Sequence, residues 1–84
     1  MATAEVSATP NPDALKFTID VTLPTMINLS SAADAATAFE REVMGIDGVA
    51  NLFGVNDFVT VTRVPGTEWE PIIAAVRNAL KEHL

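Results

Sequence analysis

Residues 49–64 read VANLFGVNDFVTVTRV, two β-rich runs with a short polar break between them. Val, Phe and Thr recur in the two runs, and these residue types favour strands. The break is Asn56-Asp57, a pair that tolerates the positive φ angles that a tight turn often requires. The stretch therefore predicts a β-hairpin with strands over residues 49–55 and 58–64.

The beginning of the chain predicts a second hairpin. Apolar residues fall on every second position at Val6 and Ala8 and again over residues 15–21, which is the alternation of half-buried strands. Between the two runs, Pro10 and Pro12 fix φ and remove backbone donors, so the chain should reverse there. This connection is longer than the favoured two-residue turn.

A helix is expected after the first hairpin. Residues 26–29 form a short extended piece, and Ser30 or Ser31 then caps a helix that runs over about residues 32–44. Two glycines that follow supply stop signals. Apolar residues at three- and four-residue steps mark one buried stripe, namely Ala36, Phe39, Val43 and Ile46.

A second helix is expected to run to near the end of the chain. Thr67, with Glu70 three residues later, forms a capping-box signature. If Thr67 is the cap, Pro71 is the fourth helical residue. Because proline has no backbone N–H, the first backbone hydrogen bond of the helix would be missing, so the first turn is irregular or the helix starts later. The apolar residues that share one helical face are Trp69, Ile72, Ile73, Val76 and Leu80.

The predicted elements follow one another in the order β-β-α-β-β-α. Each hairpin is local and each helix has a single apolar stripe, which favours an antiparallel sheet with both helices on one face. We therefore predict an α+β fold, a two-layer α/β sandwich. Eighty-four residues leave room for one core, so residues 1–84 should form a single domain in which residues 1–4 are disordered.

Charge and composition exclude several classes of function. The formal net charge is −6 and the chain has no Lys/Arg cluster, so we expect neither nucleic acid nor an anionic membrane as a partner. No apolar run is long enough to span a membrane and the N-terminus does not resemble a signal peptide, which predicts a cytoplasmic protein. Without cysteine, the chain has no thiolate nucleophile and no sulfur ligands for an iron–sulfur cluster.

No constellation of catalytic residues is recognisable. The serines lack a Gly-x-Ser-x-Gly turn, and the four glycines are dispersed rather than gathered in a phosphate-binding loop. Glu40 and Glu42 lie two positions apart on a helix and therefore diverge. His83, the only histidine, is expected at the surface and has no metal-ligand partner nearby in the sequence. We predict no enzyme activity and no catalytic, cofactor-binding or metal-binding residues.

Several motifs occur in an order that resembles a known family. Thr9-Pro10-Asn11-Pro12 followed by Leu15-Lys16-Phe17 resembles the opening motif of NifU/Nfu N-terminal domains. The similar motifs of the second half are Ile46-Asp47-Gly48-Val49, Leu52-Phe53, Asp57-Phe58-Val59-Thr60-Val61 and Trp69-Glu70. Together they cover most of residues 8–84, so we expect a standalone N-terminal domain of this iron–sulfur scaffold family.

The resemblance implies a pathway and a fold more securely than an activity. Similar members consist either of this domain alone or of this domain followed by a second one, whose Cys-x-x-Cys motif assembles or carries an iron–sulfur cluster. Residues 1–84 lack that motif. The implied function is a non-catalytic accessory or adaptor domain that binds a cysteine-bearing scaffold or a recipient apoprotein. Two alternatives remain open: a carboxylate-based iron-binding or metal-delivery protein, and a small-molecule-binding domain or enzyme.

Candidate partner contacts lie on one strand, in the two hairpin loops and at the start of the second helix. Lys16 occupies the polar phase of its strand, on the sheet face opposite the helices, and offers one of only five basic charges to an acidic partner. The loop residues indicate turn geometry first and recognition second. Trp69 belongs to a residue type enriched in binding hot spots, yet its register with Ile72 also suits the core. The full set is Asn11, Lys16, Thr18, Asn56, Asp57 and Trp69.

Overall fold

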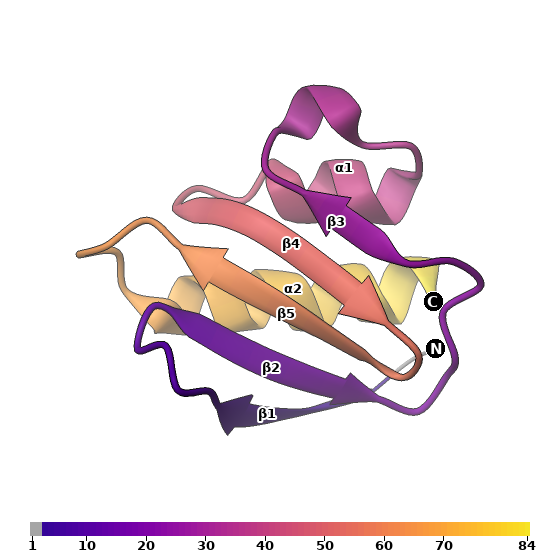
Figure 1. Cartoon of the computed structure of the whole chain (residues 1–84), viewed down its shortest axis with the longest axis horizontal. Helices are drawn as coiled ribbons and strands as arrows, with labels where there is room; N and C mark the ends of the chain where they lie inside the picture. Colours follow the sequence, from indigo (N-terminus) through magenta and orange to yellow (C-terminus); the bar gives the residue numbers. More distant parts are fainter. Residues whose placement is uncertain (1–2) are drawn as a thin grey trace.

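An antiparallel sheet forms one layer of the structure, a computed structural model that describes residues 3–84 (Figure 1). Its five strands are β1 (Ala4–Ala8), β2 (Ala14–Ile19), β3 (Ile27–Leu29), β4 (Val49–Val55) and β5 (Phe58–Arg63). They lie in the order β1-β2-β5-β4-β3 across the sheet. The predicted α+β class is confirmed, and the extended piece expected at residues 26–29 becomes a fifth strand at one edge.

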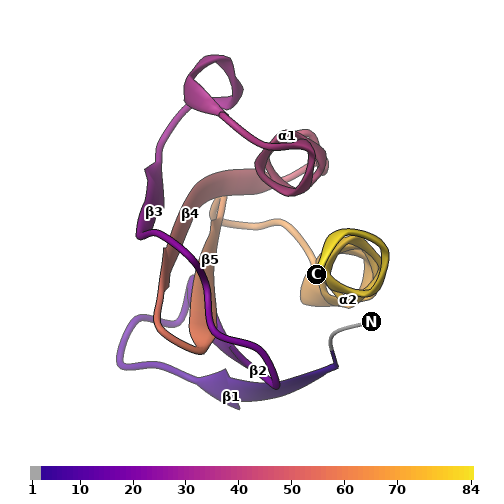
Figure 2. The same ribbon diagram turned by 90° about the vertical axis from the view of Figure 1, so that its right-hand side faces the viewer.

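Two helices, α1 (Ala38–Met44) and α2 (Trp69–His83), form the second layer and cover the same face of the sheet (Figure 2). A short 3-10 turn, η1 (Ala32–Asp34), lies between β3 and α1. The predicted two-layer sandwich with both helices on one face is confirmed. The side chains enclosed between the layers form the core.

Strand alternation decides which side chains enter the core. Strand pairing sets Phe17 beside Val59 and Leu52 beside Val61, and all four side chains are fully buried. Burial of each such side chain stabilises the folded state by about 1.5–3 kcal/mol, compared with leaving the side chain exposed to water. The helices complete the core with Phe39, Val43, Ile72, Val76, Ala79 and Leu80.

The turn between β4 and β5 has the geometry that the sequence predicts. Asn56 has a φ of 55°, in the left-handed region that asparagine tolerates. The turn also holds the end of β2, because the Ile19 N–H donates to the Asp57 carbonyl at 2.7 Å. The Leu23 N–H donates to the Asn56 carbonyl at 2.6 Å. The predicted hairpin is confirmed, and its turn is hydrogen-bonded to the end of β2 and to the loop that follows β2.

The first helix begins at Ala38 rather than near residue 32, so its predicted start was wrong. Ser31 does act as a cap, but only of η1, where its side chain accepts a backbone N–H. A second cap starts α1. Thr37 Oγ1 accepts the Glu40 N–H at 3.1 Å, and the Glu40 carboxylate accepts the Ala36 N–H at 2.9 Å. This exchange of hydrogen bonds satisfies backbone donors at the helix N-terminus. Ala36 precedes the helix and is exposed, so it does not belong to the buried stripe in which it was predicted.

The predicted capping box at Thr67 and Glu70 was also wrong. Helix α2 begins at Trp69, and its N-cap residue, Glu68, makes no side-chain cap bond. Pro71 is therefore the third helical residue, a position whose N–H has no partner within the helix. The missing N–H of Pro71 therefore removes no backbone hydrogen bond from α2. The helix starts later than a cap at Thr67 would place it, which is one of the two outcomes expected from this proline.

Tertiary contacts hold Thr67 instead. Arg63 Nη1 donates to the Thr67 carbonyl at 2.8 Å. The Thr67 side chain lies so close to Gly48 that a Cβ added there would meet Thr67 Cγ2 at 2.3 Å. Gly48 also has a φ of 93°, a conformation that side chains disfavour. These contacts fix the path of the chain just before α2.

The first strand is anchored at its start. The Thr3 N–H donates to Asp20 Oδ1 at 3.0 Å, and β1 begins at Ala4. Of the four residues expected to be disordered, Thr3 and Ala4 are thus placed by hydrogen bonding and strand pairing, whereas residues 1–2 lie outside the described part of the chain. Within residues 3–84, no helix combines the length and the apolar content needed to cross a bilayer.

Candidate functional site

One face of the sheet is left uncovered by the helices (Figure 2). Side chains on this open face alternate with those in the core, because successive residues of a strand point to opposite sides. Strand pairing sets Lys16 and Phe53 on either side of Thr60, and Thr18 beside Phe58. We call this group of five residues, Lys16, Thr18, Phe53, Phe58 and Thr60, the open-face cluster.

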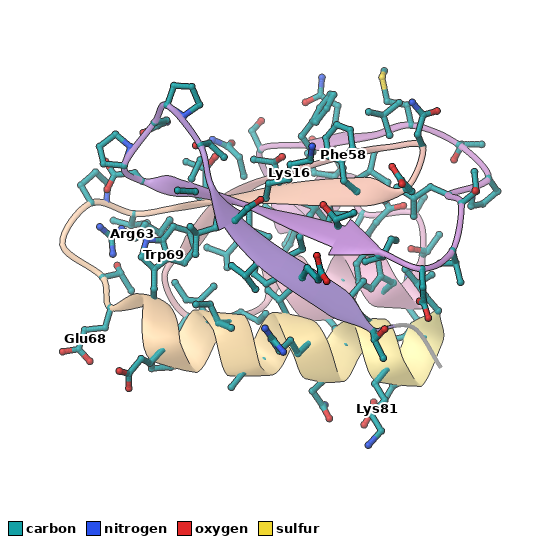
Figure 3. The ribbon with its side chains drawn as sticks, turned by 90° about the horizontal axis from the view of Figure 1, so that it is seen from below. Lys16, Phe58, Arg63, Glu68, Trp69 and Lys81 are labelled. Carbon is teal, nitrogen blue, oxygen red and sulfur yellow. The ribbon has the colours of Figure 1, made fainter. Side chains whose placement is uncertain are left out.

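Aromatic rings form the centre of the open-face cluster. The ring centroids of Phe53 and Phe58 are 6.4 Å apart, within the range of interacting aromatic pairs. Phe53 is 37% exposed although it is large and apolar. Lys16 Nζ lies 4.5 Å from the Phe58 ring centroid (Figure 3), a cation–π contact worth about 0.5–1 kcal/mol at an exposed site. The cluster thus presents two aromatic rings and one positive charge.

Four of the predicted partner contacts lie in this region. Lys16 and Thr18 belong to the open-face cluster, and Asn56 and Asp57 form the turn that leads directly into Phe58. The Asp57 carbonyl accepts a hydrogen bond from the N–H of Ile19, the residue that follows Thr18 at the end of β2. The structure therefore brings these four residues to one end of the open face.

Asn11 lies apart from them, in the loop that precedes β2. Its side-chain Oδ1 accepts the Asp13 N–H at 2.9 Å, and its carbonyl accepts a hydrogen bond from Thr9 Oγ1 at 2.9 Å. These bonds form the loop itself, as asparagine side chains often do in turns. The turn geometry predicted as the first role of Asn11 is confirmed.

Trp69 also lies apart, in the helix layer. Its half-buried ring packs against the core, and the Arg63 guanidinium carbon lies 5.0 Å from the ring centroid (Figure 3). Arg63 Nε in turn pairs with Asp13 Oδ1 at 3.1 Å. Trp69 therefore joins the packing between the layers, as its register with Ile72 indicates.

Sequence reasoning missed Phe53 and Phe58 as candidate contacts. Both follow from the alternation of the hairpin strands, because Leu52 and Val59 are fully buried and their neighbours must point to the other face. The signal that could have identified them is a large aromatic residue at a strand position whose side chain points to solvent. Exposed apolar patches of this kind often mark interaction sites.

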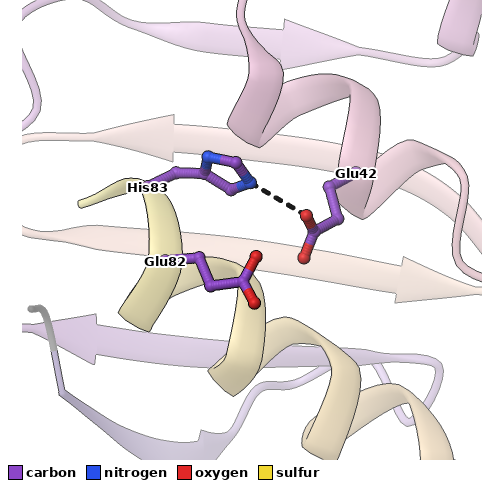
Figure 4. A group of neighbouring side chains, drawn as sticks. All are labelled: Glu42, Glu82 and His83. Carbon is purple, nitrogen blue, oxygen red and sulfur yellow. Dashed lines mark hydrogen bonds and ion pairs between the residues drawn. The ribbon is translucent and has the colours of Figure 1, made fainter.

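A second group of polar side chains lies where α1 and α2 meet (Figure 4). Glu42, Glu82 and His83 each have a ligand-forming atom, and these atoms all lie within 4.8 Å of one another. His83 Nε2 and Glu42 Oε1 are 2.8 Å apart. We call these three residues the helix-end cluster. Sequence spacing did not reveal it, because Glu42 and His83 are 41 positions apart and only helix packing brings them together.

A cavity of about 230 Å³ opens beside the helix-end cluster, and His83 forms part of its wall. The remaining walls come from the loop before β3, the start of β3, the beginning of α1 and Leu84. They include the buried apolar residues Leu23, Ile27 and Phe39. The cavity is smaller than the ~300–1,000 Å³ of common small-molecule sites. It therefore offers room for a small group beside the imidazole.

The residues present do not fit an iron–sulfur cluster held by sulfur. Such clusters are ligated by Cys thiolates, with His replacing part of the set in one class, and none of the 84 residues is a cysteine. The helix-end cluster offers carboxylate oxygens and an imidazole nitrogen. These donors suit a single metal ion.

The five-stranded sheet and the two helices on one side of it define a small two-layer α+β domain with one uncovered sheet face. A family model described as "Scaffold protein Nfu/NifU N terminal" matches residues 4–84. A NifU-like protein of Schizosaccharomyces pombe is 35% identical over 81 residues, which are 90% of this chain and 31% of that protein. The chain therefore belongs to the Nfu/NifU N-terminal family, and the resemblance found in its motifs is confirmed.

Further relatives agree with this assignment. Conserved virulence factor C of Staphylococcus aureus is 23% identical over 84 residues, which are 98% of this chain and 22% of that protein. The crystal structure of Staphylococcus aureus protein SAV1430 matches with a TM-score of 0.81 at 25% identity, covering 92% of this chain and 96% of that one. The chain spans less than a third of the length of the two curated relatives. Family membership associates it with iron–sulfur-related processes.

Proposed function

We propose that the chain is a non-catalytic accessory or adaptor domain of cytoplasmic iron–sulfur cluster assembly, and that it binds a protein partner through the open-face cluster. The observation that carries this proposal is the aromatic pair of Phe53 and Phe58, on a sheet face that no other element of residues 3–84 covers. Aromatic residues are enriched, and most charged residues depleted, at the centres of protein interfaces. The open-face cluster has this composition.

The partner that we propose is a cysteine-bearing scaffold or a recipient apoprotein. Family membership supports the link to iron–sulfur processes. Because these 84 residues include no cysteine, thiolate ligands for a cluster must come from outside them. The net charge of −6 disfavours nucleic acid and anionic membranes as alternative partners.

Affinity capture from the native cell, with and without iron starvation, tests this function when the captured proteins are identified by mass spectrometry. The wild-type chain is expected to retain a protein that carries cluster-ligating cysteines. Phe53→Ser should weaken binding of that purified protein at least about tenfold, because truncation of a hot-spot aromatic residue removes about 2 kcal/mol or more. Ala74→Ser, on the exposed face of α2, should bind like the wild type.

A charge-matched pair of variants supplies an independent test. Lys16→Glu reverses the only charge of the open-face cluster, whereas Lys81→Glu reverses a charge on α2 that points away from the sheet (Figure 3). Only the first should weaken capture. Equal capture by Phe53→Ser, Lys16→Glu and the wild type would reject the open face as the docking site, and the absence of any cysteine-bearing partner would reject the function.

A further inference from the structure

The helix-end cluster joins three metal-ligand side chains from two helices (Figure 4). Glu42 comes from α1, and Glu82 and His83 come from the last turn of α2. Their two carboxylate oxygens and one imidazole nitrogen lie within 4.8 Å of one another. Ligand atoms around one tetrahedral or octahedral ion are roughly 3 Å apart, given metal–ligand bonds of about 2 Å. Small side-chain rotations would therefore close the three donors on one ion.

The contact between His83 and Glu42 accounts for only part of this arrangement. It joins Nε2 to Oε1 at 2.8 Å and leaves Glu82 as a second carboxylate close to the first. Asn78 Nδ2 donates to Glu82 Oε1 at 3.4 Å, which orients that carboxylate along its own helix. Two carboxylates this close repel each other, and a divalent cation between them would remove the repulsion.

The surroundings of the helix-end cluster also favour a cation. Glu82 and His83 lie at the C-terminal end of a 15-residue helix, where backbone carbonyls carry partial negative charge. The three side chains are at least partly exposed, so an ion can enter without unfolding of the chain. Of the three side chains, His83 also lines the neighbouring cavity, so its imidazole is not enclosed on that side.

We propose that Glu42, Glu82 and His83 form a binding site for one divalent transition-metal ion, which links α1 to the end of α2. A set of one imidazole nitrogen and two carboxylate oxygens suits Zn²⁺ and Fe²⁺. Three protein ligands leave at least one coordination position for an exchangeable ligand. The site does not depend on the open-face cluster, because the helices and the open face lie on opposite sides of the sheet (Figure 2).

Isothermal titration calorimetry of the untagged protein with Zn²⁺, in buffer free of chelators, tests the site. The wild type is expected to bind a single ion per chain with saturable heat, and Fe²⁺ under anaerobic conditions should compete for the same site. Glu42→Gln, Glu82→Gln and His83→Ala should each lower the Zn²⁺ affinity at least about tenfold, because even outer-shell changes in metal sites cost 10–100-fold. Glu70→Gln, an exposed change in the first turn of α2, is the matched control and should bind like the wild type.

Paramagnetic broadening by Mn²⁺ in NMR spectra locates the ion and should centre on residues 42, 82 and 83. The proposal is overturned if the wild type gives no saturable Zn²⁺ heat, if the three ligand variants bind like the wild type, or if broadening centres elsewhere. Circular dichroism of each variant checks that loss of binding does not reflect loss of fold. Phe53→Ser should keep wild-type Zn²⁺ affinity, so failure of partner capture and failure of metal binding are distinguishable.

Discussion

The two faces of the sheet are made by the same strands, but their side chains have different surroundings. On the helix face, β2 and β5 contribute Phe17 and Val59, which are fully buried. On the open face, the adjacent residues Lys16 and Phe58 remain partly exposed. A shift of one position along a strand therefore moves a side chain from the core to a surface that is free for contact. Stability and recognition should accordingly respond to different substitutions.

The largest expected effect is that of Phe17→Ala on stability. Truncation of a buried phenylalanine costs about 3–5 kcal/mol, which lowers the melting temperature of a domain of this size by more than about 12 °C. Phe53→Ala, its counterpart on the open face, should cost less, about 1–2 kcal/mol, because the residue is 37% exposed and its truncation leaves no cavity in the core. Thermal unfolding followed by circular dichroism measures both. Similar losses for the two variants would break the distinction between the faces.

A smaller effect is expected within the helix layer. Thr37→Ala removes the hydroxyl that caps α1 and should lower the free energy of unfolding by about 1 kcal/mol. Ser31→Ala should cost less, because Ser31 caps only η1, in which no residue is buried. Urea unfolding midpoints compare the two variants. An equal loss would mean that η1 supports the fold as much as α1 does.

The smallest expected change in stability is that of Lys16→Gln. The substitution removes the cation–π contact with Phe58 and should lower stability by about 0.5–1 kcal/mol at most. Partner binding should nevertheless fall, because the open-face cluster loses its positive charge. Unfolding and partner binding are measured on the same preparation of Lys16→Gln. A large loss of stability with unchanged binding would show that Lys16 serves the fold rather than recognition, which is the opposite of what we expect for the open face.

The hairpins could be predicted because their signals are local. Asn56-Asp57 specifies a turn between two adjacent β-rich runs, and the alternation around Phe17 fixes which face is buried. The start of the first helix was less accessible, since Ser31 and Thr37 both have the chemistry of a cap. Thr37 starts α1 because Glu40 completes the exchange of hydrogen bonds with the backbone. This signature was present in the sequence and could have been read from it.

Other features depend on residues distant in the sequence. Thr67 has the spacing of a cap with Glu70, yet its contacts with Gly48 and Arg63 place it before α2 begins. The helix-end cluster likewise exists only because α1 packs beside α2. A single sequence indicates the residue types in such groups, but their proximity arises from tertiary packing.

Docking of the partner on the open face can be tested most directly by NMR. The ¹⁵N-labelled chain is titrated with the purified cysteine-bearing protein identified by capture, and amide shifts are mapped on the two layers. We expect the largest shifts at Lys16, Thr18, Phe53, Phe58 and Thr60, with α2 little affected and with weaker binding by Phe53→Ser. Shifts concentrated on α1 and α2, together with unchanged binding by Phe53→Ser, would contradict docking on the open face.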